Sequence, residues 1–482
     1  MPLSMLAITR LPLPTLMAIG AIGALIIISW SYSNWRRAVK LAFVILLFEG
    51  ALRKWVFPSG QELVYFMKDV FLFGAYLRFF LAPDSDIRAY RLNASGTLIA
   101  LLCALVAMTA LNPNIGSGLL ALYGIKIYLF YVPLAFMMPY LFRSNEEMVR
   151  QLTWYALLAI PICLLGVVQY GAGANSWLNV YSQQEAMQET GAAGFGFGER
   201  VRITGTFSYL SGHTTFVIFF GMLQLTLLSL KETRWKWIYI GISLPLLMGN
   251  AFMGGSRSSV VTLGLLVAGY AVASMTGKIK SDRNFTATLI AVGLICFVGA
   301  VYFFSDAWMN ISRRFETAGD TVHSRTIDMP LKAMGRALDT SGLTGLGIGL
   351  GHPATFALRR VLQIPLPRIQ APVFDNELGQ VLVELGLFGF TAWYALRLVF
   401  LVMVWKSFSK EGISGPVKAL SLGAVLLVGP HLVMSVVLNH TANMFLFGLT
   451  GLALIPRKQP LLARQHVPRP EIPTQPKVMG SK

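Results

Sequence analysis

Long apolar runs without interruption are the feature of this sequence that most limits its fold. A helix needs about 20 apolar residues to cross the hydrocarbon core of a bilayer, whereas a barrel strand needs about ten residues of alternating pattern. The runs here are continuous, so they predict an all-α, polytopic transmembrane helix bundle of about 12 to 13 spans. We expect these spans near residues 15–32, 38–57, 63–82, 95–111, 118–142, 151–170, 210–230, 237–253, 259–275, 286–304, 377–405, 417–436 and 441–456.

Composition supports this class and excludes two others. Of the 482 residues, 55% are apolar and 13% are charged, whereas a soluble domain has about 25% charged residues. Aromatic residues make up 12% of the chain, which excludes a disordered protein because disorder requires low hydrophobicity. The formal charge of +18 would suggest a nucleic-acid partner for a soluble chain. In a membrane protein, basic residues first report orientation, so we expect no nucleic acid here.

Lysine and arginine residues gather in alternate loops, as the positive-inside rule predicts. Six alternate loops and the C-terminal tail hold 22 of the 40 cationic residues, while the short loops opposite hold only Arg200, Arg202 and Arg257. The C-terminus is then cytoplasmic, and an odd number of spans places the N-terminus outside. The first apolar run has no clear small-residue cleavage site and is followed by more spans. We therefore interpret it as an anchor helix and not as a removed signal peptide.

This topology divides the chain into six parts. They are N-terminal transmembrane helices (1–170), a first outer loop (171–209), central transmembrane helices (210–304), a large outer loop (305–376), C-terminal transmembrane helices (377–456) and a disordered, Pro-rich cytoplasmic tail (457–482). Outer loops of such length are usually functional or disordered. The larger one has amphipathic stretches at 331–338 and 353–362, so we expect it to be partly helical and to fold over the outer mouth of the bundle.

The stretch Gly254–Ser259 connects two short predicted spans on the outer side. Each span has about 17 residues, so at about 1.5 Å per residue the tip of this hairpin would lie near the lipid phosphates. Arg257 would offer its guanidinium group there, and Ser258 or Ser259 would cap the following helix, whose N-terminus favours an anion. Ser256, Arg257 and Ser258 thus form a candidate anion site. The alternative is a snorkelling arginine beside a tight turn.

A second cluster lies in the first outer loop, just before an apolar helix. Arg202 precedes a glycine-containing turn and would face the hairpin at the membrane surface, as a partner for a diphosphate would need to do. Arg200 is a further candidate, although a solvated loop position is the simpler interpretation. His213 lies near the start of the helix and is more typical of a hydrogen-bonded packing residue than of a catalyst.

The large outer loop supplies a pair of motifs. His323 and Arg325 form the first, and His352 ends the glycine-rich stretch 345–351. A Gly-x-Gly-x-Gly pattern outside a βαβ unit does not predict a dinucleotide site, so we interpret the stretch as a flexible turn over a ligand.

Asp375 lies where the large loop re-enters the membrane, near the level predicted for Arg257. A carboxylate in this position can take a proton from a hydroxyl group if partial burial raises its pKa. The alternative is a helix N-cap made by Asp375 or by Asn376, and both roles can coexist.

Ionisable residues inside the predicted spans are costly, so each one points to a specific role. Glu49 and Arg53 are four residues apart in span two and can pair on one helix face. Lys68 and Asp69 lie in span three, and Lys126 lies in span five. A structural ion-pair network between these spans is one interpretation, and a path for a charged lipid headgroup is the other.

In these motifs and in their order, the sequence resembles the superfamily of O-antigen ligases and O-antigen polymerases, which are glycan transferases of the bacterial inner membrane. The resemblance covers about residues 150 to 455 and includes the many spans and the two unequal outer loops. The matching stretches are Arg202 in Arg-x-Thr-Gly-Thr-Phe, the Ser256-Arg257 hairpin, Arg325 before the glycine-rich turn, Asp375-Asn376-Glu377, and Glu384-Leu385-Gly386-Leu387-Phe388-Gly389. Members often have His-Asn where this chain has Asp375-Asn376, which leaves His352 or His323 as substitutes for the base.

The resemblance implies an enzyme that transfers a glycan from undecaprenyl diphosphate to an acceptor hydroxyl on the periplasmic side. Arginine suits the diphosphate because its planar donors bind phosphate in pairs and keep their charge. We therefore expect no metal and no other cofactor. The expected partners are the undecaprenyl-diphosphate-linked glycan, membrane lipid and other polysaccharide-assembly proteins. The expected catalytic residues are Asp375, Arg257 and Arg325, and the expected substrate-binding residues are Arg202, Arg200, Ser256, Ser258 and His352.

Within this superfamily we favour a polymerase of exopolysaccharide or O-antigen repeat units, because Glu49–Trp55 resembles a motif of a subgroup found with exopolysaccharide genes. A ligase that uses a lipid core as acceptor is the first alternative. The second is a transporter of lipid-linked oligosaccharides, whose expected signs are inverted repeats and broken helices in matching halves. A nucleotide-sugar transferase would use Asp84-Ser85-Asp86 to bind a metal, but that loop is too short to hold a nucleotide.

Overall fold

The computed structural model describes most of the chain, including nearly all of the predicted spans. The described residues are 13–58, 61–84, 94–180, 201–231, 233–279, 284–303, 328–372 and 376–454, together with the isolated residues 281, 305, 308, 309, 312, 313 and 374.

Within these residues the chain forms helices and no β-strand, as the apolar runs predict. The main helices are α2 (Leu13–Ser33), α3 (Trp35–Ala51), α4 (Gln61–Leu81), α5 (Ala94–Ala110), α6 (Gly118–Leu129), α7 (Leu134–Met137), α8 (Asn145–Leu157), α9 (Ala159–Gly171), α10 (Leu210–Ser229), α12 (Leu244–Met253), α13 (Arg257–Met275), α14 (Phe285–Phe303), α17 (Met329–Ser341), α18 (Pro353–Val361), α19 (Glu377–Ser409), α20 (Gly415–Val428) and α21 (His440–Ala453). The two amphipathic stretches predicted in the large loop correspond to α17 and α18.

Each predicted span coincides with one helix or with a run of consecutive helices. In the described residues, five helical segments are long and apolar enough to cross a membrane by themselves, and these are Asn145–Gly171, Leu210–Ser229, Arg257–Met275, Glu377–Ser409 and Gly415–Leu432. The pair Gly118–Leu129 and Leu134–Tyr140, bent by 43°, forms a sixth candidate. These lengths are compatible with a multi-pass membrane protein, and the larger number of spans remains a prediction.

Three helix breaks have local causes. Pro133 cannot donate a helical hydrogen bond and its ring would clash with the carbonyl of Leu129, so α6 ends there and α7 begins after the proline. Pro430 acts in the same way after α20. Gly386 interrupts α19 with a φ of +67°, and a Cβ atom at this position would clash with the backbone of Leu343 and Gly345. The break in α19 therefore gives the large loop a place to pack.

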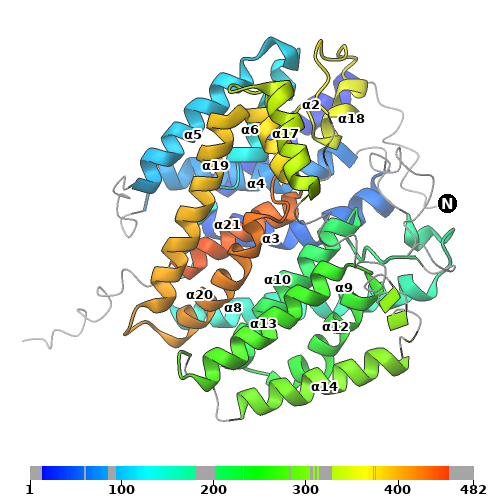
Figure 1. The fold of residues 1–482 in the computed structure, drawn as a ribbon, viewed down its shortest axis with the longest axis vertical. Helices are drawn as coiled ribbons and strands as arrows, with labels where there is room; N and C mark the ends of the chain where they lie inside the picture. The colour runs from blue at the N-terminus through cyan, green and yellow to red at the C-terminus, as the bar shows by residue number, and fades with distance from the viewer. Residues whose placement is uncertain are drawn as a thin grey trace, which may run out of the picture.

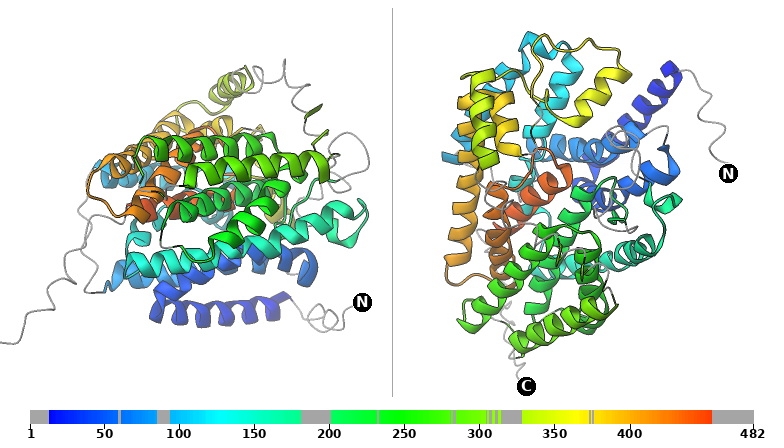
Figure 2. Two further views of the ribbon diagram at one scale, coloured as in Figure 1. Left: turned by 90° about the horizontal axis from the view of Figure 1, so that it is seen from below. Right: turned by 45° about the vertical axis from the view of Figure 1, so that its right-hand side comes forward.

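Helix α10 forms the centre of the bundle. Of its 20 residues, 17 are buried, which is typical of a helix that is surrounded on all sides. It packs against α8, α12, α13, α20 and α21. Figure 1 shows α10 and α21 inside the bundle, with α14 along one edge and α5 and α19 on another flank. Both views in Figure 2 place α2 at the periphery.

Candidate functional site

The candidate anion site begins at the turn between α12 and α13. Gly255 has a φ of +62°, and α13 begins at Arg257 with Ser256 in the N-cap position. The hydroxyl groups of Ser256 and Ser258 lie 2.8 Å apart, and Ser259 donates to the carbonyl of Ser256 at 2.7 Å. The prediction that Ser258 or Ser259 caps α13 was wrong, because both lie inside its first turn. Arg257 thus lies at a helix N-terminus, where unpaired N–H groups favour an anion.

The segment 201–208 lies directly against this turn. The Nε atom of Arg202 donates to the carbonyl of Gly254 at 3.0 Å, and the backbone N–H of Ile203 donates to the carbonyl of Met253 at 3.4 Å. Arg202 and Gly254 are 52 residues apart in the sequence. The fold therefore brings the Arg202 stretch and the Ser256–Arg257 turn together on one side of the bundle.

The Glu49–Trp55 stretch supports the segment 201–208 from α3 and from the π-helical turn Leu52–Val56 that follows it. The Nζ atom of Lys54 donates to the hydroxyl of Thr204 at 3.1 Å. A terminal guanidinium nitrogen of Arg53 donates to the hydroxyl of Ser208 at 2.9 Å. Two sequence motifs that are about 150 residues apart thus form one structural unit.

Two glycines allow the close approach within this unit. A Cβ atom on Gly50 would clash with the backbone of Thr206 and Ser208. Gly205 has a φ of +56° and is held from both sides by Gln169, which accepts its N–H at 2.7 Å and donates to its carbonyl at 3.1 Å. The positive φ favours glycine at position 205, since side chains crowd the backbone in that region.

Two helix N-termini adjoin the segment 201–208, and a third lies beside one of them. α13 begins at the turn that contacts Arg202, and α10 begins directly after the segment. Asn439 caps α21 and also donates to the hydroxyl of Thr215 in the first turns of α10 at 2.8 Å. Helix N-termini carry partial positive charge. Together with Arg53, Lys54 and Arg202, they give this part of the molecule a positive potential.

A group of aromatic and histidine side chains lies on the other side of Arg53. The Arg53 guanidinium carbon lies 5.2 Å from the centre of the Tyr65 ring. The Tyr65 hydroxyl is 3.2 Å from that of Tyr123, which in turn lies 3.2 Å from Nδ1 of His352 and 3.4 Å from Nε2 of His440. Arg53 therefore lies between the segment 201–208, which bears Arg202, and the group of rings that includes His352.

Each histidine has one buried ring nitrogen without a hydrogen-bond partner among the described residues, namely Nε2 of His352 and Nδ1 of His440. The backbone N–H of Ala354 donates to Nδ1 of His352, so the proton of this neutral ring lies on Nε2. Burial, aided by the charge of Lys126, lowers the pKa of His352 to about 3, so it is neutral near pH 7. The hydroxyl hydrogen of Tyr123 decides whether Nδ1 of His440 is a donor or an acceptor. The pair can thus offer one donor and one acceptor to a hydroxyl group.

The glycine-rich stretch 345–351 is buried and packs against α19. The interpretation of this stretch as a flexible turn over a ligand was therefore wrong. Its backbone N–H groups at Gly349 and Gly351 donate to the carboxylate of Glu384 at 2.9 and 3.0 Å. Tyr128 and Gln380 also donate to this carboxylate. Successive backbone N–H groups form an anion-binding concavity, and its occupant here is a side chain of the protein itself. The turn thereby fixes the start of α18, where His352 is the N-cap.

Four of the charged residues named within the predicted spans form ion pairs, as the structural interpretation predicts. Lys68 lies 2.7 Å from Glu49, and Lys126 lies 2.7 Å from Asp69. Tyr131 donates to the same Asp69 carboxylate at 2.7 Å. These contacts connect α3, α4 and α6. Because the paired charges neutralise one another, they are not available to bind a charged lipid headgroup.

The remaining predicted positions differ in how they compare with the structure. Asn376 caps α19 through the N–H of Gly379, so one of the two predicted caps is confirmed. His213 is buried against Phe207 and Phe216, as a packing residue would be, but neither of its ring nitrogens has a hydrogen-bond partner among the described residues, so the predicted hydrogen bond was wrong. Four candidates lie outside the described residues, and these are Arg200, His323, Arg325 and Asp375.

Asp84, from the motif considered for metal binding, is engaged by its own protein. The indole N–H of Trp35 donates to it at 2.9 Å, and Arg36 and Arg78 lie 2.8 and 2.7 Å away. The Trp35 hydrogen bond and the neighbouring arginines lower the pKa of this carboxyl group. Asp84 is therefore an anchor between α3 and α4. In the part of the chain that the structure describes, no group of three or more His, Cys, Asp or Glu side chains could hold a metal ion.

Sequence reasoning missed Tyr65, Tyr123 and His440 as members of the site. The two tyrosines lie in apolar runs in which nothing distinguishes them from packing residues. His440 begins an apolar helix, and the cost of a histidine there was the one signal that could have pointed to it.

Comparison of the chain with protein-family models, with curated proteins and with solved structures finds no match. Function must therefore be inferred from the residues and their geometry.

Proposed function

We propose that this protein is a metal-independent glycosyltransferase of the bacterial inner membrane that uses a glycan on undecaprenyl diphosphate as its donor. The observation that carries the proposal is the contact between the Arg202 segment and the Ser256–Arg257 turn. It gathers arginines and a helix N-terminus on the side opposite the lysine- and arginine-rich loops, which is the outer side by the positive-inside rule.

The chemistry of the donor explains why this arrangement suits it. A diphosphate is a good leaving group, so the main requirement is to stabilise the negative charge that develops on it as the bond to the sugar breaks. Arg202 and Arg257 would bind the phosphate oxygens, with Ser256 and Ser258 as hydroxyl donors beside them. Arg53 and Lys54, which hold the segment 201–208, add positive charge from the opposite side. Arg200 and Arg325 are proposed as further ligands.

The acceptor hydroxyl must lose a proton as its oxygen attacks the sugar. Asp375 is one proposed base. His440 is the alternative, because its Nδ1 lacks a partner among the described residues and accepts a proton when the ring hydrogen lies on Nε2, while His352 offers its Nε2–H as a donor. We favour repeat-unit polymerisation over ligation because the Glu49–Trp55 stretch, which supports the segment that bears Arg202, resembles a motif of a subgroup found with exopolysaccharide genes.

A substitution at Arg257 tests the proposal. In a strain that lacks the gene, Arg257→Ala should abolish surface polysaccharide while the protein still inserts into the membrane at normal levels. Arg150→Ala, at an exposed arginine of the loop predicted to be cytoplasmic, is the matched control and should leave the polysaccharide unchanged. Normal polysaccharide from Arg257→Ala would remove the site assignment.

The deletion strain separates the related activities. Single repeat units on the surface would identify a lost polymerase, and accumulated long lipid-linked chains would identify a lost ligase. A purified protein that moves lipid-linked oligosaccharide across vesicles without lengthening it would instead be a transporter.

A further inference from the structure

A large apolar cavity lies between α3, α8, α10 and α21. Its volume is about 400 Å³. Lys40 lines it from α3, and Arg53 lies thirteen residues further along the chain, which is about 20 Å at the helical rise. The Lys40 end of the cavity therefore lies toward the loops that are rich in lysine and arginine, away from Arg53 and the segment that it holds.

The interior of this cavity offers almost no hydrogen bonds. Its walls are mainly carbon, for example at Phe43, Phe219 and Leu449. The hydroxyl of Tyr155 donates to the carbonyl of Phe43 at 3.0 Å and is already satisfied. Such a space can hold a hydrocarbon chain but not a sugar or a nucleotide.

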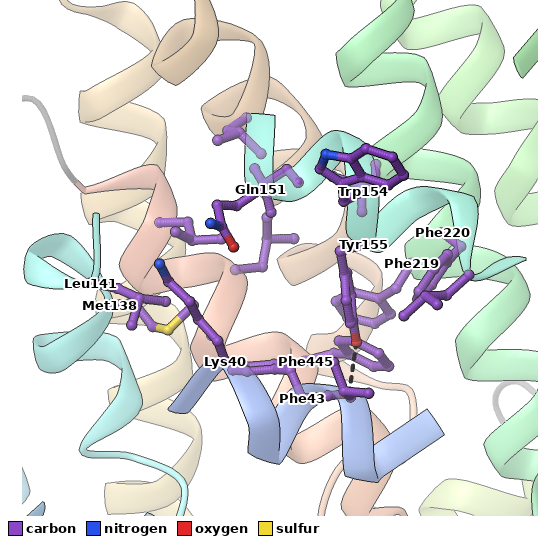
Figure 3. Close-up of a pocket in the computed structure, with 18 of the residues that line it drawn as sticks. Lys40, Phe43, Met138, Leu141, Gln151, Trp154, Tyr155, Phe219, Phe220 and Phe445 are labelled. Carbon is purple, nitrogen blue, oxygen red and sulfur yellow. Dashed lines mark hydrogen bonds between the residues drawn. The ribbon is translucent and has the colours of Figure 1, made fainter. Parts of the chain in front are cut away.

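Polar groups gather at one end of the cavity. Figure 3 shows the amine of Lys40 and the amide of Gln151 side by side, away from Phe219 and Phe220. Lys40 donates to Glu147 at 2.9 Å, which uses one of its three N–H bonds.

The cavity also reaches the protein surface. Trp154 lines it and is 58% exposed. Its ring packs edge to face against Trp235, at a centroid distance of 4.8 Å. Tryptophans of this kind are enriched where a membrane protein meets the headgroup region. A lipid can therefore enter from the side.

The size and charge of the cavity favour one occupant. Apolar cavities of about 150 Å³ already bind small hydrocarbons, and an empty cavity loses van der Waals contacts along its walls. A peptide helix about 10 Å wide would fill this volume with a single turn, so the space suits a flexible chain better. At its polar end, the Lys40 ammonium group keeps two N–H bonds beyond the one to Glu147 and lies beside the Gln151 amide, which suits an anionic headgroup.

We propose that this cavity binds one acyl chain of an anionic phospholipid from the cytoplasmic leaflet, with the phosphate near Lys40 and Gln151. The chain would lie between Phe43 of α3, Leu152 of α8 and Leu449 of α21. This site is independent of the glycan-transfer site, and its test requires no transferase activity.

Photolabelling of the full-length protein tests the proposal. The protein is reconstituted in nanodiscs that contain phosphatidylglycerol with a diazirine in its acyl chain, and labelled residues are mapped by mass spectrometry. We expect strong labelling of the wall residues 43–44, 152–158 and 445–452. Leu449→Trp, which fills the cavity, should reduce this labelling at least fivefold. Leu265→Trp, at an exposed position of α13, is the matched control and should not.

Two further measurements complete the test. If Leu449→Trp does not fold, Leu152→Phe replaces it. Lys40→Gln should abolish the preference of the cavity for phosphatidylglycerol over phosphatidylcholine. Labelling confined to exposed helix faces, or labelling that cavity-filling variants leave unchanged, would overturn the site. Equal labelling by both lipids in the wild-type protein would overturn its anionic headgroup.

Discussion

Replacing Glu384 with alanine should strongly destabilise the packing of the glycine-rich turn on α19. The Glu384 carboxylate accepts hydrogen bonds from the backbone N–H groups of Gly349 and Gly351 and from the side chains of Tyr128 and Gln380. All of these groups are buried. The substitution therefore leaves several donors without a partner at once.

The magnitude follows from the number of donors left unsatisfied. Each buried donor without a partner costs about 1–3 kcal/mol. The two backbone N–H groups cannot turn away, whereas the tyrosine and glutamine side chains can partly reorient. Loss of the carboxylate also removes the cost of its own burial. We therefore expect the free energy of unfolding to fall by roughly 3–5 kcal/mol, a large part of the about 5–15 kcal/mol that is typical of a folded protein.

The assay is unfolding of the purified protein by titration with a denaturing detergent, followed by circular dichroism. Glu411→Ala, at an exposed glutamate after α19, is the control and should change the free energy by less than about 0.5 kcal/mol. Because the turn holds His352 at the start of α18, the proposed glycan transfer should fall together with stability. A Glu384→Ala protein with the stability of the control would refute the view that this carboxylate organises the turn.

Other buried contacts lead to three further predictions. Asp69→Asn leaves the Lys126 ammonium group buried without its partner and should lower the free energy of unfolding by about 3–5 kcal/mol. Adding Lys126→Met should recover most of this loss, and no recovery would show that the pair is not coupled. Gly345→Ala should cost more than about 2 kcal/mol in the same titration, because this residue has a φ of +80° and its Cβ atom would clash with the backbone of α19, whereas Gly335→Ala, with open space around it, should be neutral or stabilising. The pKa of His352 is lowered to about 3 from 6.5, so between these pH values the unfolded chain binds a proton at this histidine and the folded chain does not. The free energy of unfolding should therefore fall by about 1 kcal/mol per pH unit below 6.5. His352→Asn should reduce this slope, and an equal slope in both proteins would contradict the assignment.

Features that depend on neighbouring residues could be predicted from the sequence. Apolar runs placed the helices of the bundle, because hydrophobicity and helix length are local properties. The amphipathic pattern placed α17 and α18 in the large loop. The cap of α19 by Asn376 follows from the preference of asparagine for this position.

Partners that are distant in the sequence could not be predicted in this way. Glu49 has Arg53 one helical turn away, yet it pairs with Lys68 of the next helix. Tyr123 and His440 meet across 317 residues, and neither carries a local signal of that contact. The glycine-rich turn resembles a ligand loop, but Glu384 occupies it from α19.

The sequence by itself determined that the chain is helical, which segments are apolar enough for a membrane, and which arginines lie beside turns. Only the tertiary structure decided which of these groups meet and which charges cancel one another. The physical reason is that helix formation and hydrophobic length depend on a few consecutive residues, whereas buried polar groups take whichever partner the packing of the whole bundle brings within hydrogen-bond distance.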